Sequence, residues 1–138
     1  MRKQWLLALV LFLLPSLAFA QSGTVGPTNQ IYCNKVATLA VGSTGDQQVI
    51  AAVTGQLVFI CGWHITNTGV SGTFAFDYGT GSNCGTGKVA VIPAQNVTSN
   101  APSADHTGNA YYNTIASQAF CVNPSVNTIA GVIFYAQF

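Results

Sequence analysis

Residues 56–78 read QLVFICGWHITNTGVSGTFAFDY, which is two apolar runs on either side of a short polar segment. The runs at 56–67 and 72–78 are rich in Val, Ile, Phe and Trp, the residues that favour strands. The residues between them, at 67–71, include Asn, Gly and Ser, which favour turns. This stretch therefore predicts two strands joined by a short connection.

The pattern extends along the chain in both directions, and no segment has convincing helical periodicity. Further strands are predicted at 47–53, 88–92, 119–123 and 127–138, with weaker ones at 31–39 and 111–115. About eight strands within residues 31–138 indicate an all-β fold. We expect a single antiparallel β-sandwich of jelly-roll type that forms one domain.

Alternation assigns side chains of the strand at 56–67 to two faces. One face would carry Leu57, Phe59, Cys61, Trp63 and Ile65, and the other Val58, Ile60, Gly62 and His64. Both sets are apolar, so this strand is predicted to be central and covered on both sides. The strand at 127–138 also has few polar positions, so either the sheets are thick or the second sheet face meets another subunit.

The first twenty residues have the layout of a secretory signal peptide. Met1, Arg2 and Lys3 form a basic start, an apolar run follows at 5–14, and residues 18–20 are a small-x-small cleavage site. The run is too short to span a bilayer, which takes about 20 residues. We expect cleavage before residue 21, a flexible leader at 21–30, no membrane span after cleavage, and a secreted, periplasmic or cell-surface protein.

The cysteines are Cys33, Cys61, Cys84 and Cys121, an even number in a chain predicted to be exported. Their spacing lacks the close pairs of a zinc site, so no metal centre is expected. Two disulfides are predicted instead, in any of three connectivities. We favour Cys33–Cys61 with Cys84–Cys121, and the other two pairings stay open.

Charge is scarce once residues 1–20 are removed. Two lysines and three aspartates remain, so the net charge falls from +1 to −1. A nucleic-acid partner needs several Lys or Arg to neutralise phosphates and is therefore excluded. Without glutamate, free thiols or a nucleophile motif, no enzyme activity and no cofactor are expected. An uncharged surface suits neutral glycans and self-association.

The candidate ligand-binding residues are Asp105, His106, Tyr111 and Tyr112. They lie in or just after a polar stretch at 94–110 that is predicted to be a long loop, where binding residues often occur. Tyrosine offers a flat apolar ring and a hydroxyl group, which suits sugar rings. Alternation directs one tyrosine of the pair into the core.

Several segments resemble a loose group of small, uncharacterised β-sandwich proteins of phages, prophages and environmental bacteria. The resemblance lies in YGTGSNCGTG at 78–87, FCV at 120–122, FYAQF at 134–138, and VIAAV at 49–53 followed by the strand with Cys61. It covers most of residues 33–138 and implies a jelly-roll-like domain on a virion or cell surface, with a trimer as one candidate assembly. It implies no catalytic residues.

These observations predict a secreted, non-enzymatic protein that acts in surface assembly or self-association, with copies of itself as the expected partner. A neutral-glycan or cell-surface recognition module, similar to an adhesin or a phage receptor-binding protein, is the alternative. A third interpretation rests on the apolar alternation that ends at Phe138, which resembles the closing strand of a small outer-membrane barrel.

Overall fold

Strands make up most of the described structure, a computed structural model that covers residues 30–106, 110 and 112–138. Over these residues the strands are β1 (Lys35–Ala40), β2 (Gln47–Ile50), β3 (Val58–Asn67), β4 (Gly72–Thr80), β5 (Thr86–Val97), β6 (Pro102–His106), β7 (Tyr112–Asn113), β8 (Ala119–Pro124) and β9 (Ile129–Gln137). A single-turn 3-10 helix, η1, spans Ser82–Cys84. None of the described residues forms a helix of membrane-spanning length and hydropathy. The predicted signal peptide and nearly all of the leader lie outside the described residues.

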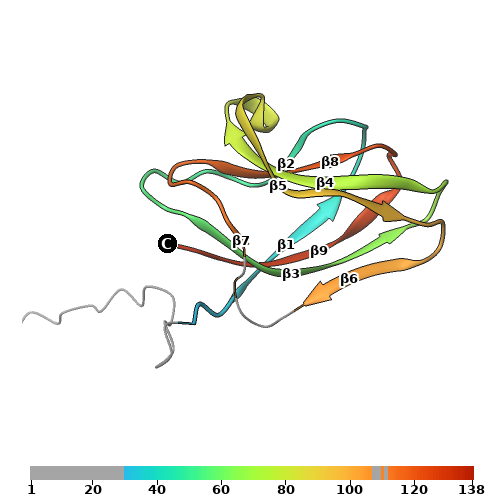
Figure 1. The fold of residues 1–138 in the computed structure, drawn as a ribbon, viewed down its shortest axis with the longest axis horizontal. Coiled ribbons are helices and arrows are strands. Elements are labelled where there is room, and N and C mark those ends of the chain that lie inside the picture. The colour runs from blue at the N-terminus through green and yellow to red at the C-terminus, as the bar shows by residue number, and fades with distance from the viewer. Residues whose placement is uncertain (1–29, 107–109, 111) are drawn as a thin grey trace, which may run out of the picture.

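The strands form two antiparallel sheets that pack face to face (Figure 1). One sheet has the order β1-β9-β3-β6, with the short β7 also paired to β3. The other has the order β2-β8-β4-β5. The predicted all-β sandwich is confirmed.

The pairing of the strands is nested in the way that defines a jelly roll. Apart from the two-residue β7, the first strand pairs with the last, the second with the last but one, and so on inward. Successive pairs alternate between the two sheets, so a long folded hairpin wraps around one core. The predicted jelly-roll type is therefore confirmed, with nine described strands where about eight were expected.

Aromatic and branched side chains from both sheets fill the space between them. The Trp63 ring lies edge-on to Phe76 with centroids 5.3 Å apart, and Phe76 is 5.1 Å from Phe120. Ile65 and Ile133 are fully enclosed beside them. These side chains come from the apolar runs that predicted the strands, which explains why the sheets pack together.

A β-bulge at Cys61 makes the face assignment for β3 partly wrong. Ile60 pairs with Tyr135 while Gly62 pairs with the next residue, Phe134, so Cys61 is an extra residue in the strand. The insertion reverses the alternation halfway along β3. Val58 and Ile60 therefore face the core together with Trp63 and Ile65, whereas His64 is exposed.

Both disulfides have the favoured connectivity. Cys33, just before β1, is bonded to Cys61 at the bulge, and Cys84 in η1 is bonded to Cys121 in β8. The bonds close loops with sequence separations of 28 and 37. Each sheet thus carries one covalent link to a segment outside its regular strands.

The long loop predicted at 94–110 is wrong over most of its length. The strand predicted at 88–92 extends as β5 from Thr86 to Val97, and β6 occupies Pro102–His106. The sequence PSADH of β6 has no apolar alternation, so it gave no strand signal. It is a strand because its backbone pairs with the edge of β3.

Candidate functional site

The predicted ligand-binding residues lie at β6 and β7. The backbones of Asp105 and His106 pair with Trp63 and Gly62 of β3. Their side chains, and the whole of Tyr111, lie outside the described residues. Tyr112 pairs with Ile60, and its half-buried ring packs against the core. Tyr112 therefore contributes to packing, and ligand binding by the four residues stays a prediction.

A cluster of three charged side chains, which the sequence analysis missed, links β2, β4 and β5. Lys88 Nζ on β5 lies 2.7 Å from Oδ1 of Asp46, just before β2, and 3.3 Å from Oδ2 of Asp77 on β4. These are three of the five charged residues that follow position 21. No local motif contains them, because only the strand order brings them together.

Burial dominates the electrostatics of this cluster. The Asp77 side chain is only 4% exposed, and the loss of water around its carboxylate raises its pKa, although the hydrogen bond and charge of Lys88 oppose the rise. The hydrogen bond to Asp46 is the main cause of the raised pKa of Lys88. The charge of Lys88 therefore offsets that of a buried carboxylate, and the cluster has a structural role. Among the described residues, no group of three His, Cys or Asp side chains could hold a metal ion.

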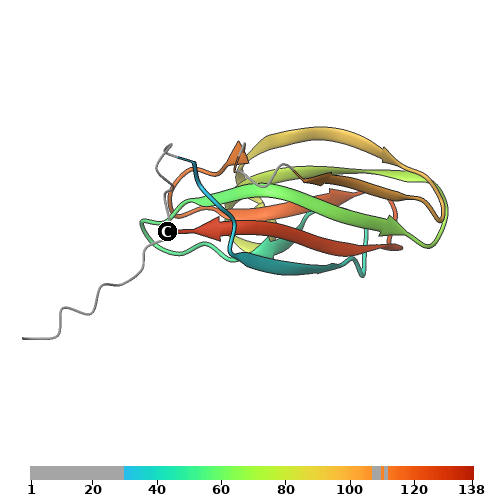
Figure 2. The same ribbon diagram turned by 90° about the horizontal axis from the view of Figure 1, so that it is seen from below.

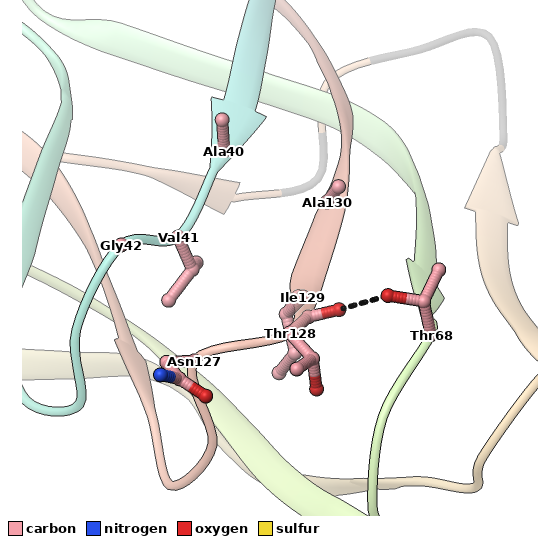
Figure 3. A pocket seen from close by; sticks show the side chains of 8 residues that line it. All are labelled: Ala40, Val41, Gly42, Thr68, Asn127, Thr128, Ile129 and Ala130. Carbon is pink, nitrogen blue, oxygen red and sulfur yellow. Dashed lines mark hydrogen bonds between the residues drawn. The ribbon is translucent and has the colours of Figure 1, made fainter.

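A neutral hollow of about 410 Å³ lies at one end of the sandwich (Figure 3). The residues that line it are Ala40, Val41, Gly42, Thr68, Asn127, Thr128, Ile129 and Ala130. Among these residues, the Thr68 hydroxyl donates a hydrogen bond of 3.4 Å to the Thr128 carbonyl oxygen. The lining offers hydroxyl, amide and methyl groups and no ionised group.

A buried amide holds the walls of this hollow in place. Asn67 is fully buried at the end of β3, and its Nδ2 donates a 2.6 Å hydrogen bond to the Val70 carbonyl oxygen. Its Oδ1 accepts hydrogen bonds from the Gly69 N–H at 3.1 Å and the Thr128 hydroxyl at 2.6 Å. The turn after β3 is thereby fixed against the start of β9, so the hollow is preformed.

The outer face of the first sheet, over β1, β9 and β3, presents a group of uncharged side chains. Strand pairing aligns its side chains in rows: Val36 with Phe134, Thr38 with Val132 and His64, and Ala40 with Ala130 and Thr66. Residues that alternate with them, such as Leu39, Ile65 and Ile133, face the core. We call these eight residues the β1–β9–β3 face, and Figure 2 shows the three strands side by side.

Exposure on the β1–β9–β3 face is substantial for apolar residues. Val36 is 58% exposed, Ala40 and Ala130 are exposed, and Val132 and Phe134 are half-buried. None of the eight is Lys, Arg, Asp or Glu. An apolar surface of this kind on a sheet commonly marks a contact with another molecule.

Comparison of the chain with known protein families, curated proteins and solved structures found no match.

Proposed function

We propose that this protein is a secreted, non-enzymatic structural protein that assembles with copies of itself through the β1–β9–β3 face. The observation that carries the proposal is the set of uncharged rows across three adjacent strands, with Val36, Val132 and Phe134 at least partly exposed. Such a face agrees with the expectation that a sheet of this chain meets another subunit.

The physical basis is the low cost of removing water from this face. Valine, alanine and phenylalanine side chains gain free energy when they leave water, by about 25 cal/mol per Å² of apolar area. Two copies of the face bring no lysine, arginine or carboxylate side chains together, because none of its eight residues is Lys, Arg, Asp or Glu. The exposed hydroxyls and His64 can form hydrogen bonds at the rim of a contact.

The two disulfides support a site of action outside the cytosol. Cys33–Cys61 and Cys84–Cys121 persist where the environment is oxidising. The predicted signal peptide at 1–20 leads to the same compartment. Export would therefore precede self-assembly, and the apolar faces would meet only outside the cytosol.

The test is a matched pair of valine-to-lysine variants in the exported chain. Val132→Lys places a cation in the middle of the face, whereas Val89→Lys places the same cation on β5, where Val89 is 44% exposed. We expect sedimentation analysis to show an oligomer for the wild type and for Val89→Lys, and at least about tenfold weaker association for Val132→Lys. A wild type that is monomeric up to about 100 µM would overturn the proposal.

Recognition of a neutral glycan is a second candidate function, and the hollow favours it. Thr68, Asn127 and Thr128 offer groups that match sugar hydroxyls, and Val41 offers an apolar surface. A glycan array followed by titration would identify a ligand, and Asn127→Ala should weaken its binding. If Asn127→Ala binds normally but the pair Tyr111→Ala/Tyr112→Ala does not, the ligand site lies at β7 instead. An array with no binder would remove this function.

A further inference from the structure

Five strands of the described sandwich lie at sheet edges, among them the two-residue β7, and only β1 lacks the features that block pairing with another strand. β5 contains Pro93 and several irregularities in register, and β6 begins at Pro102. β2 has four residues and a bulge. In contrast, β1 keeps an unbroken register over its six residues and contains no proline. Edges of this kind readily accept a further strand.

The hydrogen bonding of β1 shows which backbone groups are available. The N–H of Val41, which follows β1, donates to the Ile129 carbonyl oxygen at 3.0 Å. In an antiparallel ladder the N–H and C=O of one residue point to the same neighbour, and the direction alternates along the strand. The odd-numbered residues therefore bond to β9, and the groups of Val36, Thr38 and Ala40 point away from the sheet.

This parity restricts how a second copy of β1 can pair. Two antiparallel copies about a two-fold axis must place outward-pointing residues opposite each other, and an axis at the middle one of Val36, Thr38 and Ala40 does so for all three. Thr38 is the central one, which sets Thr38 opposite Thr38 and Val36 opposite Ala40. Each of these pairs exchanges two N–H···O hydrogen bonds.

The same register separates the only charges on β1. Lys35 would lie opposite Val41 of the second copy, so the two lysines would be roughly 20 Å apart along the strands. That distance exceeds the Debye length of about 8 Å at physiological salt, and their repulsion would be screened. Lys35 Nζ also lies 5.9 Å from the Tyr135 ring centroid, within the same sheet. Charge therefore does not oppose pairing in this register.

We infer that β1 of one copy pairs with β1 of a second copy about a two-fold axis at Thr38. The inference rests on the proposed self-assembly and specifies its contact. The two β1-β9-β3-β6 sheets become one continuous sheet, and the β1–β9–β3 face of one copy continues into that of the other. Edge pairing would build the dimer, and the doubled face would allow dimers to stack.

The first experiment compares Thr38→Pro with Thr38→Val in the exported chain. Proline removes the outward N–H of residue 38 without breaking a hydrogen bond to β9, and valine keeps the N–H. We expect Thr38→Val to dimerise like the wild type and Thr38→Pro to associate at least about tenfold more weakly. Unchanged association of a folded Thr38→Pro would overturn the inference.

A second measurement does not depend on whether the proline variant folds. Opposed residues in a hydrogen-bonded pair have Cα atoms about 5.5 Å apart, within disulfide range. Oxidised glutathione should therefore link two Thr38→Cys chains, as their thiols form a disulfide and glutathione is reduced. The matched control is Thr44→Cys, in the exposed loop after β1, which should stay unlinked.

The outcomes separate this inference from the proposed function. If the wild type associates, but Thr38→Pro has no effect and Thr38→Cys does not cross-link, the edge contact is wrong and the face contact stands. A monomeric wild type with rapid hydrogen exchange at the amides of Val36, Thr38 and Ala40 overturns both. A monomer in which these amides are protected shows that another segment of the same chain covers the edge, which also overturns the inference.

Discussion

The two sheets of this jelly roll differ in the placement of their charged side chains. The sheet β2-β8-β4-β5 is bordered by an ion-paired cluster in which Lys88 contacts Asp46 and Asp77. The β1–β9–β3 face of the other sheet contains no Lys, Arg, Asp or Glu, although Val36 on it is 58% exposed. The cluster is ion-paired within the chain, whereas the face offers a surface that water solvates poorly.

This difference shows that composition alone does not locate a contact surface. A chain with five charges after position 21 could scatter them evenly and discourage association everywhere. Here three of them gather at a single place, one lysine in contact with two carboxylates. The other two, Lys35 and Asp105, lie on β1 and β6, and the eight residues of the β1–β9–β3 face include no Lys, Arg, Asp or Glu. That face is therefore the one suited to self-assembly.

Loss of the disulfide beside the charged cluster should have the largest effect on stability. Cys84 and Cys121 are both fully buried, and Cys121 pairs with Asp77 in the adjacent strand. We expect Cys84→Ala/Cys121→Ala to lower the free energy of unfolding by about 4 kcal/mol, because the unfolded chain regains the freedom of a long loop. Urea unfolding with the wild type as reference measures the change.

The matched variant for the other sheet is Cys33→Ala/Cys61→Ala. Its loop is of similar length, but Cys33 is only half-buried and precedes β1, so we expect a loss of about 3 kcal/mol. If this variant loses more free energy of unfolding than the other, the sheet with the uncharged face depends more on its disulfide than the second sheet does. That order would be the opposite of the one expected here.

Removal of Lys88 should have an intermediate and pH-dependent effect. Lys88→Met leaves the buried Asp77 carboxylate without its cation, so the folded-state pKa of Asp77 rises further above its ordinary value. Since Lys88 is partly exposed, we expect a loss of only about 1–2 kcal/mol at pH 7. Thermal unfolding of both proteins across pH 3–7 measures it.

The sign of the pH dependence identifies the cause. A carboxyl group with a raised folded-state pKa loses stability as the pH rises from its unfolded pKa to its folded pKa. The difference between Lys88→Met and the wild type should therefore be small near pH 3, where Asp77 is protonated in both states, and should grow above about pH 4. A difference that is the same at every pH would indicate lost packing of the lysine stem instead.

The sequence predicted the sandwich because its apolar runs are strong, and the structure explains where prediction failed. The strands around Trp63 and Phe76 are alternating and apolar, so their existence was clear. The bulge at Cys61 inserts one residue, and no local signal showed that the alternation would reverse there. β6 is a strand because of its neighbour β3, which a reading of its own residues could not reveal.

The candidate sites were less predictable than the fold because they are products of strand order. Asp46, Asp77 and Lys88 come from three strands or their ends, and the hollow joins Thr68 and Asn127 from separate turns. Such residues lie far apart along the chain, so no sequence motif identifies them. The apolar alternation near the C-terminus did indicate a second apolar sheet face, because alternation alone places side chains on the outside of a strand.

The smallest expected effect concerns Lys35, a charged residue at the start of β1. Its Nζ lies 5.9 Å from the Tyr135 ring centroid, and an exposed contact of this kind contributes about 0.5 kcal/mol. Lys35→Met should therefore change the free energy of unfolding by no more than about 0.5 kcal/mol. Its self-association should stay equal to that of the wild type or become stronger, because a charge near the contact has been removed. A clear loss of association in sedimentation runs would show that Lys35 makes a contact across the interface, and the first sheet would then use charge as well.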